Sequence, residues 1–298
     1  TLQNIIAHHY AKKHGIPYLL QPHGSLPRIM TKQGLKKLYD FLWGYRLLKD
    51  ASRIIATTNT EAEQYEEIGI AKDRIEVVPN GIDLAEFDNP PGRGEFRKKW
   101  GINNNEKIIL YLGRIHKIKG LELLTQAFAE IAREIGNIRL VIIGPDDGYL
   151  PSLKELIGEL GIEDRVLLTG PVYRRDRLKA YIDADIYALP SFYETFPISV
   201  LEACACGTPV IVTDRCGIAD IIDGQAGLAI PYDKNALFKA ILALLSDNKA
   251  AQDFGNKGRL LVRERFNWNR IARQLEATYG ELCGHPNLDK LQRTPASL

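Results

Sequence analysis

Apolar residues recur along this chain in two alternating patterns. Stretches with helical spacing alternate with short runs of β-branched and other apolar residues, which is typical of a doubly wound α/β architecture. In the first third, the pattern predicts strands over residues 17–21 and 53–57, and helices over residues 2–14, 34–49 and 60–68. Thr60 and Glu63 have the spacing of a capping box at the start of the third helix.

A second, longer series follows residues 88–94, which are rich in Pro and Gly and predict a linker. Strands are predicted over residues 108–112, 140–143, 166–168, 186–189 and 209–212. Helices are predicted near residues 119–134, 150–160, 174–183 and 197–205. Five or six parallel strands would make a complete Rossmann-like domain. The length of 298 residues also favours two domains.

Composition indicates an ordinary soluble globular protein, with 45% hydrophobic and 26% charged residues. The four cysteines show no metal-site or paired spacing, which favours free thiols in a reducing, cytoplasmic compartment. The sequence contains no run of 18 apolar residues, so no membrane span is expected.

Positive charge is concentrated near the start of the chain. Residues 11–53 contain nine Lys or Arg against two Asp, although the whole chain carries only +2. The apolar residues of this block recur at helical spacing at Leu35, Leu38, Tyr39, Leu42 and Tyr45. A basic, aromatic-rich amphipathic helix can lie on an anionic membrane surface, here the inner membrane face. The alternative, which the pattern favours, is an ordinary helix that packs its stripe on a sheet with Lys facing water. Nucleic acid is not expected because no binding motif accompanies the charge.

Residues 191–203 contain the most informative pattern. Glu194 and Glu202 lie across a predicted loop-to-helix junction, directly after the strand over residues 186–189. The helix is predicted to begin near Pro197, a residue that suits the first turn. The free amides of Ile198 and Ser199 would then face the space above the strand, and a helix start favours phosphate.

A second basic segment follows the strand over residues 108–112. Arg114 lies just beyond its carboxyl end, where open α/β sheets bind ligands, and Lys119 follows five residues later. Arg offers a planar fork to phosphate oxygens and Lys a point charge. Together with the amides near Ser199, these groups could neutralise a diphosphate without a metal or other cofactor.

Three segments resemble family 4 of the retaining glycosyltransferases, in the family's order. Residues 78–83 look like the turn that closes its first domain. Gly113-Arg114-Ile115 through Lys119-Gly120 resembles its Gly-Arg…Lys-Gly phosphate loop, and residues 191–203 carry its Glu-x7-Glu signature. The resemblance implies a GT-B fold, with two Rossmann-like domains facing a cleft, and covers residues 21–268. It also implies sugar transfer from a nucleotide diphosphate sugar to a hydroxyl of a carbohydrate or lipid-linked acceptor.

The resemblance also sets the expected domains. We expect an incomplete acceptor-side domain and linker over residues 1–93, and a donor-binding domain over residues 94–265. Residues 266–298 would form a helix that crosses back to the first domain, followed by a tail. The chain begins with Thr1 rather than Met, and its first domain has few strands, so a preceding segment is expected.

Residue roles follow from the same resemblance. Glu202 would accept hydrogen bonds from ribose hydroxyls, and Glu194 would stabilise positive character at the anomeric carbon. His23, framed by Pro22 and Gly24, would lie near the reacting carbon. The expected donor-binding set is Gly113, Arg114, Lys119, Gly144, Val172, Phe196, Ile198, Ser199 and Glu202.

The sequence departs from the family pattern at two positions, and it contains one acidic pair that could suggest a metal site. The family usually has Gly where Thr195 and Pro197 stand here. Asp183 and Asp185 have the Asp-x-Asp spacing that holds a metal in other glycosyltransferases. They precede the strand over residues 186–189, at the end of the sheet away from the expected site, so a turn is predicted instead. Gly144 is expected either to let the backbone approach the donor or to serve a tight turn.

Polysaccharide or glycolipid biosynthesis is the process that these features favour. Two alternatives stay open. One is a non-catalytic module that binds a nucleotide sugar. The other keeps the GT-B fold but carries out a phosphorylase or epimerase reaction.

Overall fold

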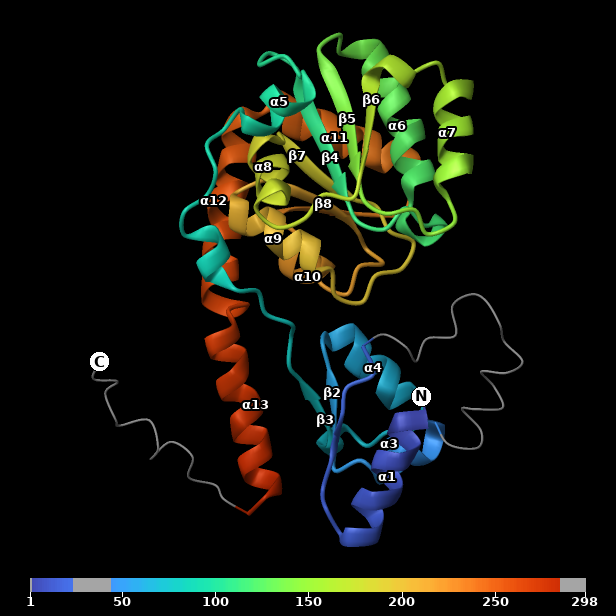
Figure 1. Cartoon of the computed structure of the whole chain (residues 1–298), viewed down its shortest axis with the longest axis vertical. Coiled ribbons are helices and arrows are strands. Elements are labelled where there is room, and N and C mark those ends of the chain that lie inside the picture. Colours follow the sequence, from blue (N-terminus) through green and yellow to red (C-terminus); the bar gives the residue numbers. More distant parts are fainter. Residues whose placement is uncertain (1, 24–43, 285–298) are drawn as a thin grey trace. The chain divides into compact units, whose positions relative to one another are not determined.

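The computed structural model describes residues 2–23 and 44–284 of the chain, which form two compact units (Figure 1). Unit 1 contains the described residues up to Asn80 and from Asn269 onward, and unit 2 is Gly81–Trp268. The change of unit therefore lies before the break expected at residues 93 and 94. Residues 81–93 belong to unit 2 because Ile82, Leu84 and Phe87 pack in its core.

Unit 1 is built on a parallel sheet in the order β1-β2-β3. Its strands are β1 (Leu19–Leu20), β2 (Arg53–Ala56) and β3 (Ile75–Val77). Its helices are α1 (Leu2–His14), α3 (Tyr45–Asp50), α4 (Asn59–Glu67) and most of α13 (Trp268–Leu282). The greater part of the helix expected over residues 34–49 lies outside the described residues.

Helix α4 begins earlier than the sequence predicted. Its N-cap is Thr58, whose hydroxyl accepts a hydrogen bond from the Glu61 amide at 3.1 Å. The Glu61 carboxylate also accepts bonds from the Thr57 amide and hydroxyl, each at 2.7 Å. Glu61 is buried, whereas Thr60 and Glu63 are exposed. The bonds of Thr58 and Glu61, and not the predicted Thr60–Glu63 capping box, therefore fix the start of the helix.

Helix α13 packs on the sheet of unit 1 although it comes from the far end of the chain. Ile271 shares a buried cluster with Ile55 and Val78. The Gln274 side chain donates to the Val77 carbonyl at 2.9 Å, and the Thr278 hydroxyl donates to the Glu76 carboxylate at 2.7 Å. The sheet of unit 1 is therefore completed by packing against a helix that follows unit 2 in the sequence.

Unit 2 contains a six-stranded, wholly parallel sheet in the order β6-β5-β4-β7-β8-β9. The strands are β4 (Lys107–Leu112), β5 (Ile138–Ile143), β6 (Val166–Gly170), β7 (Ile186–Leu189), β8 (Val210–Thr213) and β9 (Gly227–Ile230). The chain winds outward in one direction from β4 and then in the other from β7. In sheets of this order, ligands bind beyond the carboxyl ends of the strands at that reversal.

Helices cover both faces of this sheet (Figure 1). One set packs together as α7 (Leu150–Glu159), α6 (Leu121–Glu134) and α11 (Lys234–Ser246). The other consists of α5 (Glu95–Trp100), α8 (Arg175–Asp183), α9 (Ile198–Cys206) and α12 (Asn248–Arg265), with the short α10 (Ala219–Ile222) following β8. Every residue of β7 and β8 is buried, as expected for parallel strands covered on both faces.

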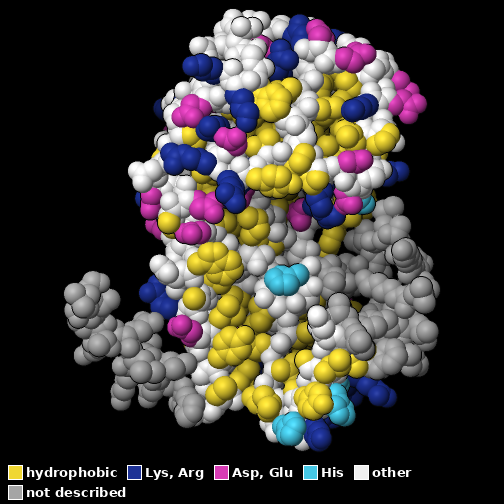
Figure 2. All heavy atoms as spheres, in the orientation of Figure 1, with side chains coloured by type: hydrophobic (Ala, Val, Ile, Leu, Met, Phe, Trp, Pro, Cys, Tyr) yellow, Lys and Arg dark blue, Asp and Glu magenta, His cyan; other side chains and the backbone are white. Residues whose placement is uncertain are grey.

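The surface of unit 2 carries both signs of charge. In Figure 2, Lys and Arg side chains alternate with Asp and Glu side chains over the visible face of this unit, with hydrophobic side chains between them. None of the described helices combines the length and apolar character needed to cross a bilayer.

Candidate functional site

Two of the predicted site residues, Lys119 and Glu194, meet where the strand order reverses. The loop after β4 and the loop after β7 meet there, and the Phe192 amide donates to the Ile118 carbonyl at 2.8 Å. The Lys119 ammonium donates a hydrogen bond to the Glu194 carboxylate. Both side chains are mostly buried, with 14% and 16% of their surface exposed. Two predicted residues that are 75 positions apart are thus in direct contact.

Gly120 allows these loops to approach. Its φ is +69°, and a Cβ at this position would lie 1.8 Å from the Pro190 carbonyl oxygen. Any other residue would force the two loops apart. The turn before it is held by His116, whose Nδ1 accepts a hydrogen bond from the Ile118 amide at 3.1 Å. The position of Lys119 is therefore fixed by the backbone on both sides.

The backbone of Glu194 is tied to a third loop, the one after β8. Its amide donates to the Arg215 carbonyl at 3.2 Å, and its carbonyl accepts from the Gly217 amide at 2.8 Å. Beneath the site, the buried Tyr111 hydroxyl donates to the Arg114 carbonyl at 2.7 Å. Burial and the nearby Glu194 charge raise the pKa of Tyr111, so it stays protonated and keeps donating this bond.

Glu202 lies on α9 and faces α8. The Arg177 guanidinium donates to one carboxylate oxygen at 3.1 Å, and the Tyr181 hydroxyl donates to the other at 3.2 Å. Arg177 also donates to the Glu86 carboxylate. Burial raises the pKa of Glu202, and the Arg177 charge opposes this shift. The sequence analysis did not single out Arg177 or Tyr181, because only the packing of α8 against α9 brings them to Glu202.

A hollow of about 680 Å³ opens beside Arg177, within the size range of small-molecule sites. Its lining is formed by Ala85, Glu86, Asn89, Tyr173, Arg174, Arg175, Arg177 and Leu178. Arg174 has φ +54°, which is unusual for a residue with a side chain. Val172, one of the expected donor-binding residues, lies two residues before Arg174 and packs partly against the core.

The remaining predicted donor residues differ in how they reach this region. Arg114 is exposed and its guanidinium pairs with the Asp147 carboxylate, so among the described residues it makes no ion pair with Glu194. Ser199 accepts a hydrogen bond from the buried Tyr187 hydroxyl at 2.7 Å. Helix α9 begins at Ile198, one residue later than predicted, with Pro197 as N-cap.

Three predicted residues have structural surroundings that the sequence did not indicate. A Cβ on Gly144, whose φ is +153°, would lie 1.8 Å from the Gly113 carbonyl oxygen, so glycine is needed there for backbone packing. The Phe196 side chain is buried against the Phe266 ring, with 5.8 Å between centroids. His23 lies in unit 1, exposed just after β1, with φ +49°.

The six-stranded unit carries the signature of a known family. Residues 92–261, more than half of the chain, match the model for glycosyl transferases group 1. The chain belongs to this family. Residues 2–86 match the model for Glycosyltransferase Family 4, which agrees with the resemblance seen in the motifs.

Curated relatives of this group 1 chain extend well beyond the matched region. A D-inositol 3-phosphate glycosyltransferase of Nocardia farcinica is 33% identical over 243 residues, covering 78% of this chain and 53% of that protein. An uncharacterized glycosyltransferase of Methanocaldococcus jannaschii is 34% identical over 213 residues, covering 70% and 54%. The chain thus spans about half the length of the curated relatives it matches.

Solved structures confirm the expected α/β GT-B class for this group 1 chain. Sucrose-phosphate synthase from Thermosynechococcus elongatus has a TM-score of 0.80 at 28% identity, covering 95% of this chain and 72% of that one. Anabaena HepE, solved in complex with UDP-glucose, has a TM-score of 0.81 at 21% identity, covering 93% and 76%. Within the described residues the first sheet has three strands, in line with the few strands that the sequence predicted for this domain.

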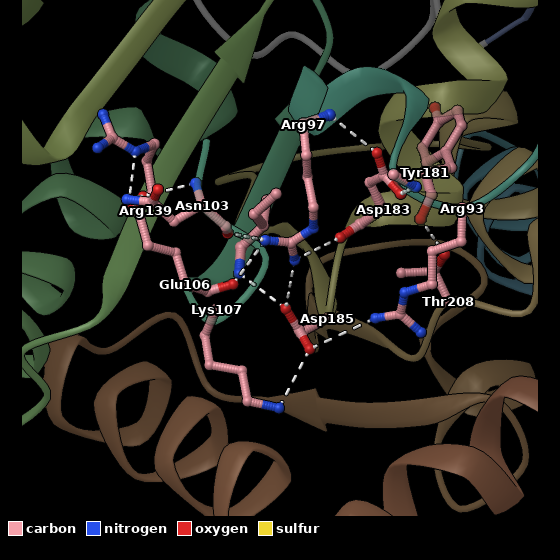
Figure 3. Close-up of polar contacts among 12 residues, drawn as sticks. Arg93, Arg97, Asn103, Glu106, Lys107, Arg139, Tyr181, Asp183, Asp185 and Thr208 are labelled. Carbon is pink, nitrogen blue, oxygen red and sulfur yellow. Dashed lines mark hydrogen bonds and ion pairs between the residues drawn. The ribbon is translucent and has the colours of Figure 1, made fainter. Parts of the chain in front are cut away.

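The Asp-x-Asp pair of this group 1 chain anchors α5 to the sheet (Figure 3). Asp183 accepts hydrogen bonds from the Gly94 amide, at 2.5 Å, and the Arg97 amide, at 3.0 Å. Asp185 accepts from the Ile108 amide at 2.8 Å. Both residues lie at the amino ends of the strands, the edge opposite the loops that hold Lys119 and Glu194. Their carboxylates therefore act as helix and strand anchors.

Proposed function

We propose that this protein is a retaining glycosyltransferase that moves a sugar from a nucleotide diphosphate sugar to a hydroxyl acceptor. The contact between Lys119 and Glu194 at the strand reversal of unit 2 supports this most directly. It joins the cation expected at the diphosphate to the carboxylate expected at the sugar. Membership of the group 1 glycosyltransferases supports the same reaction class.

The chemistry needs a stabilised leaving group and a stabilised anomeric carbon. Lys119 would neutralise charge that grows on the diphosphate as the glycosidic bond breaks. The first amides of α9 would add hydrogen bonds to the same phosphates, starting with Ile198 because Pro197 has no N–H. Glu194 would stabilise the positive character that develops at the anomeric carbon.

Glu202 and the neighbouring hollow would hold the nucleoside. In its present position Glu202 presents a carboxylate fixed by Arg177 and Tyr181, and a carboxylate suits two vicinal ribose hydroxyls. The backbone near Val172 would then meet the base, beside the hollow lined by Tyr173 and Arg174. His23 would serve on the acceptor side, as its place after β1 of unit 1 allows.

The acceptor is proposed as a hydroxyl of a carbohydrate or lipid-linked chain, in polysaccharide or glycolipid biosynthesis. The basic residues near the start of the chain would draw the protein to an anionic membrane surface, on the cytoplasmic side. Vesicles with anionic lipid test this. Activity on a lipid-linked acceptor should rise with the fraction of anionic lipid, whereas neutral vesicles should leave it as it is without vesicles.

The donor site is tested by titration calorimetry in EDTA with UDP, GDP, ADP and dTDP. UDP is tried first because the Anabaena relative was solved with UDP-glucose. Selective binding of one diphosphate, with weaker binding of its monophosphate, is the expected result. No binding of any diphosphate, with or without added magnesium, would contradict the proposed donor site.

A further inference from the structure

Arg215, whose backbone is bonded to that of Glu194, carries a cationic side chain that has no part in the site described above. Arg215 follows β8, and its carbonyl accepts the hydrogen bond from the Glu194 amide at 3.2 Å. A parallel bridge between Glu194 and Cys216 holds the same two segments in register. The Arg215 backbone is therefore held next to that of Glu194, the residue expected at the transferred sugar.

Two aromatic rings hold the Arg215 guanidinium. Its central carbon lies 4.4 Å from the centre of the Phe192 ring and 5.1 Å from that of Tyr232. These rings meet edge to face, with 5.4 Å between centroids and an angle of 89°. A Cβ on Gly120, the residue after Lys119, would lie 3.4 Å from the Tyr232 ring. The clamp formed by the Phe192 and Tyr232 rings thus belongs to the same group of loops as the Lys119–Glu194 pair.

The hydrogen-bonding edge of this guanidinium is available. Arg215 is exposed, and within residues 2–23 and 44–284 no carboxylate or carbonyl is paired with its side chain. Arg114 and Arg177 differ in this respect, since Arg114 pairs with Asp147 and Arg177 with Glu86 and Glu202. A stacked guanidinium keeps its in-plane N–H groups free for a carboxylate or phosphate.

We propose that Arg215, clamped by Phe192 and Tyr232, is a subsite for an anionic group on a sugar, either a carboxylate or a phosphate. This proposal rests on the proposed function, because it places a sugar next to Glu194. The anionic group is carried by the transferred sugar or by the acceptor sugar. The two rings orient the Arg215 guanidinium before binding, so less side-chain freedom is lost when the anion binds.

The test compares matched neutral and anionic sugars in wild type and Arg215→Gln. The donor pair is UDP-glucose and UDP-glucuronic acid, or the same sugars on whichever nucleotide binds in the calorimetric screen. The acceptor pair is glucose and glucose 6-phosphate, scored by product formation. Arg133→Gln is the control, because Arg133 is also exposed but lies at the end of α6, near the amino edge of the sheet.

Wild type should favour the anionic member of one pair by about tenfold or more, the scale of one charge-assisted contact. Arg215→Gln should lose this preference, while UDP itself and the neutral sugars change less than about twofold. The pair that responds identifies which sugar carries the anion. Arg215→Lys should recover only part of the preference, because Lys lacks the planar fork.

Three results would overturn the proposal. Wild type could treat both members of each pair alike, or Arg215→Gln could keep the preference. Arg215→Gln could also weaken UDP binding itself, which would place Arg215 at the diphosphate. Failure of the proposed function looks different, because wild type would then bind no nucleotide at all.

Discussion

The Lys119 ammonium donates a hydrogen bond to the Glu194 carboxylate across the reversal of strand order in unit 2. Each group is the other's only charged partner among the ion pairs of the described residues. A diphosphate bound at the start of α9 would offer Lys119 a stronger acceptor. Donor binding is therefore expected to draw Lys119 toward the phosphates and leave Glu194 facing the sugar.

Lys119→Ala should weaken binding of the nucleotide diphosphate by about tenfold or more, because one charge-assisted contact is lost. Titration calorimetry measures this change directly. The monophosphate should lose less affinity than the diphosphate. Lys117→Ala is the matched control, since Lys117 lies on the same turn but is exposed. Equal losses in both variants would contradict the role given to Lys119.

Nucleotide affinity should fall on acidification through the pKa of Glu202. Burial raises this pKa above its usual value of 4.5, so the loss should begin above that pH. A protonated carboxyl is the poorer acceptor for ribose hydroxyls. Calorimetry of wild type and Glu202→Gln across this range isolates the effect, because both share the titration of the nucleotide itself.

Stability should respond to the same group in the opposite sense. The raised pKa means that the folded protein favours protonated Glu202, so the stabilising contribution is complete below 4.5 and is lost as pH rises through the folded pKa. Glu202→Gln should therefore raise the melting temperature more at pH 7 than at pH 4. An unchanged difference between the two pH values would argue against a buried Glu202.

Arg177→Gln should move the pH dependence of nucleotide binding to higher pH. The Arg177 charge holds down the pKa of Glu202 against the effect of burial, and Glu86 on the far side of Arg177 acts in the opposite direction. Arg175→Gln is the control, because Arg175 lines the same hollow and, within the described part of the chain, its side chain bonds the Asn89 carbonyl and no carboxylate. A profile that moves equally in both variants would show a general charge effect.

Asp185→Ala should lower the free energy of unfolding by about 3 kcal/mol, because it leaves a mostly buried Arg97 without its carboxylate partner. Urea unfolding measures this. Asp176→Ala, which removes an exposed partner of Lys99, should cost less than about 1 kcal/mol. Nucleotide affinity in EDTA should not change in the folded Asp185 variant. A selective loss of nucleotide affinity in this variant would indicate that the Asp-x-Asp pair takes part in donor binding.

Sequence patterns predicted the strands of unit 2 that are rich in β-branched and other apolar residues, such as β4 and β8. They missed β9, which begins with Gly227, a residue type depleted in strands. Glycine is needed there because a Cβ would lie 1.8 Å from the Val210 carbonyl oxygen. They also missed β3, a three-residue strand with a Glu at its centre. Short strands give too little periodicity to be separated from loops.

The candidate site also contains residues that the sequence predicted and residues that it did not. The motifs predicted Lys119, Glu194 and Glu202, because these residues lie at fixed spacings beside strands and helix starts. The partners Arg177 and Arg215 come from other loops and helices, and their contacts arise from packing between elements. Gly144 was explained only by the close approach of the Gly113 backbone. Spacing along the chain carries no information of that kind.

The division of labour between the two glutamates is the most direct test of the account. Calorimetry with the preferred nucleotide diphosphate, followed by detection of sugar release or transfer from its sugar donor, should be run on Glu202→Ala and Glu194→Ala. Glu202→Ala should bind the nucleotide at least about tenfold more weakly. Glu194→Ala should keep its affinity and lose turnover. Equal loss of nucleotide binding in both variants, or turnover that survives in Glu194→Ala, would contradict the account.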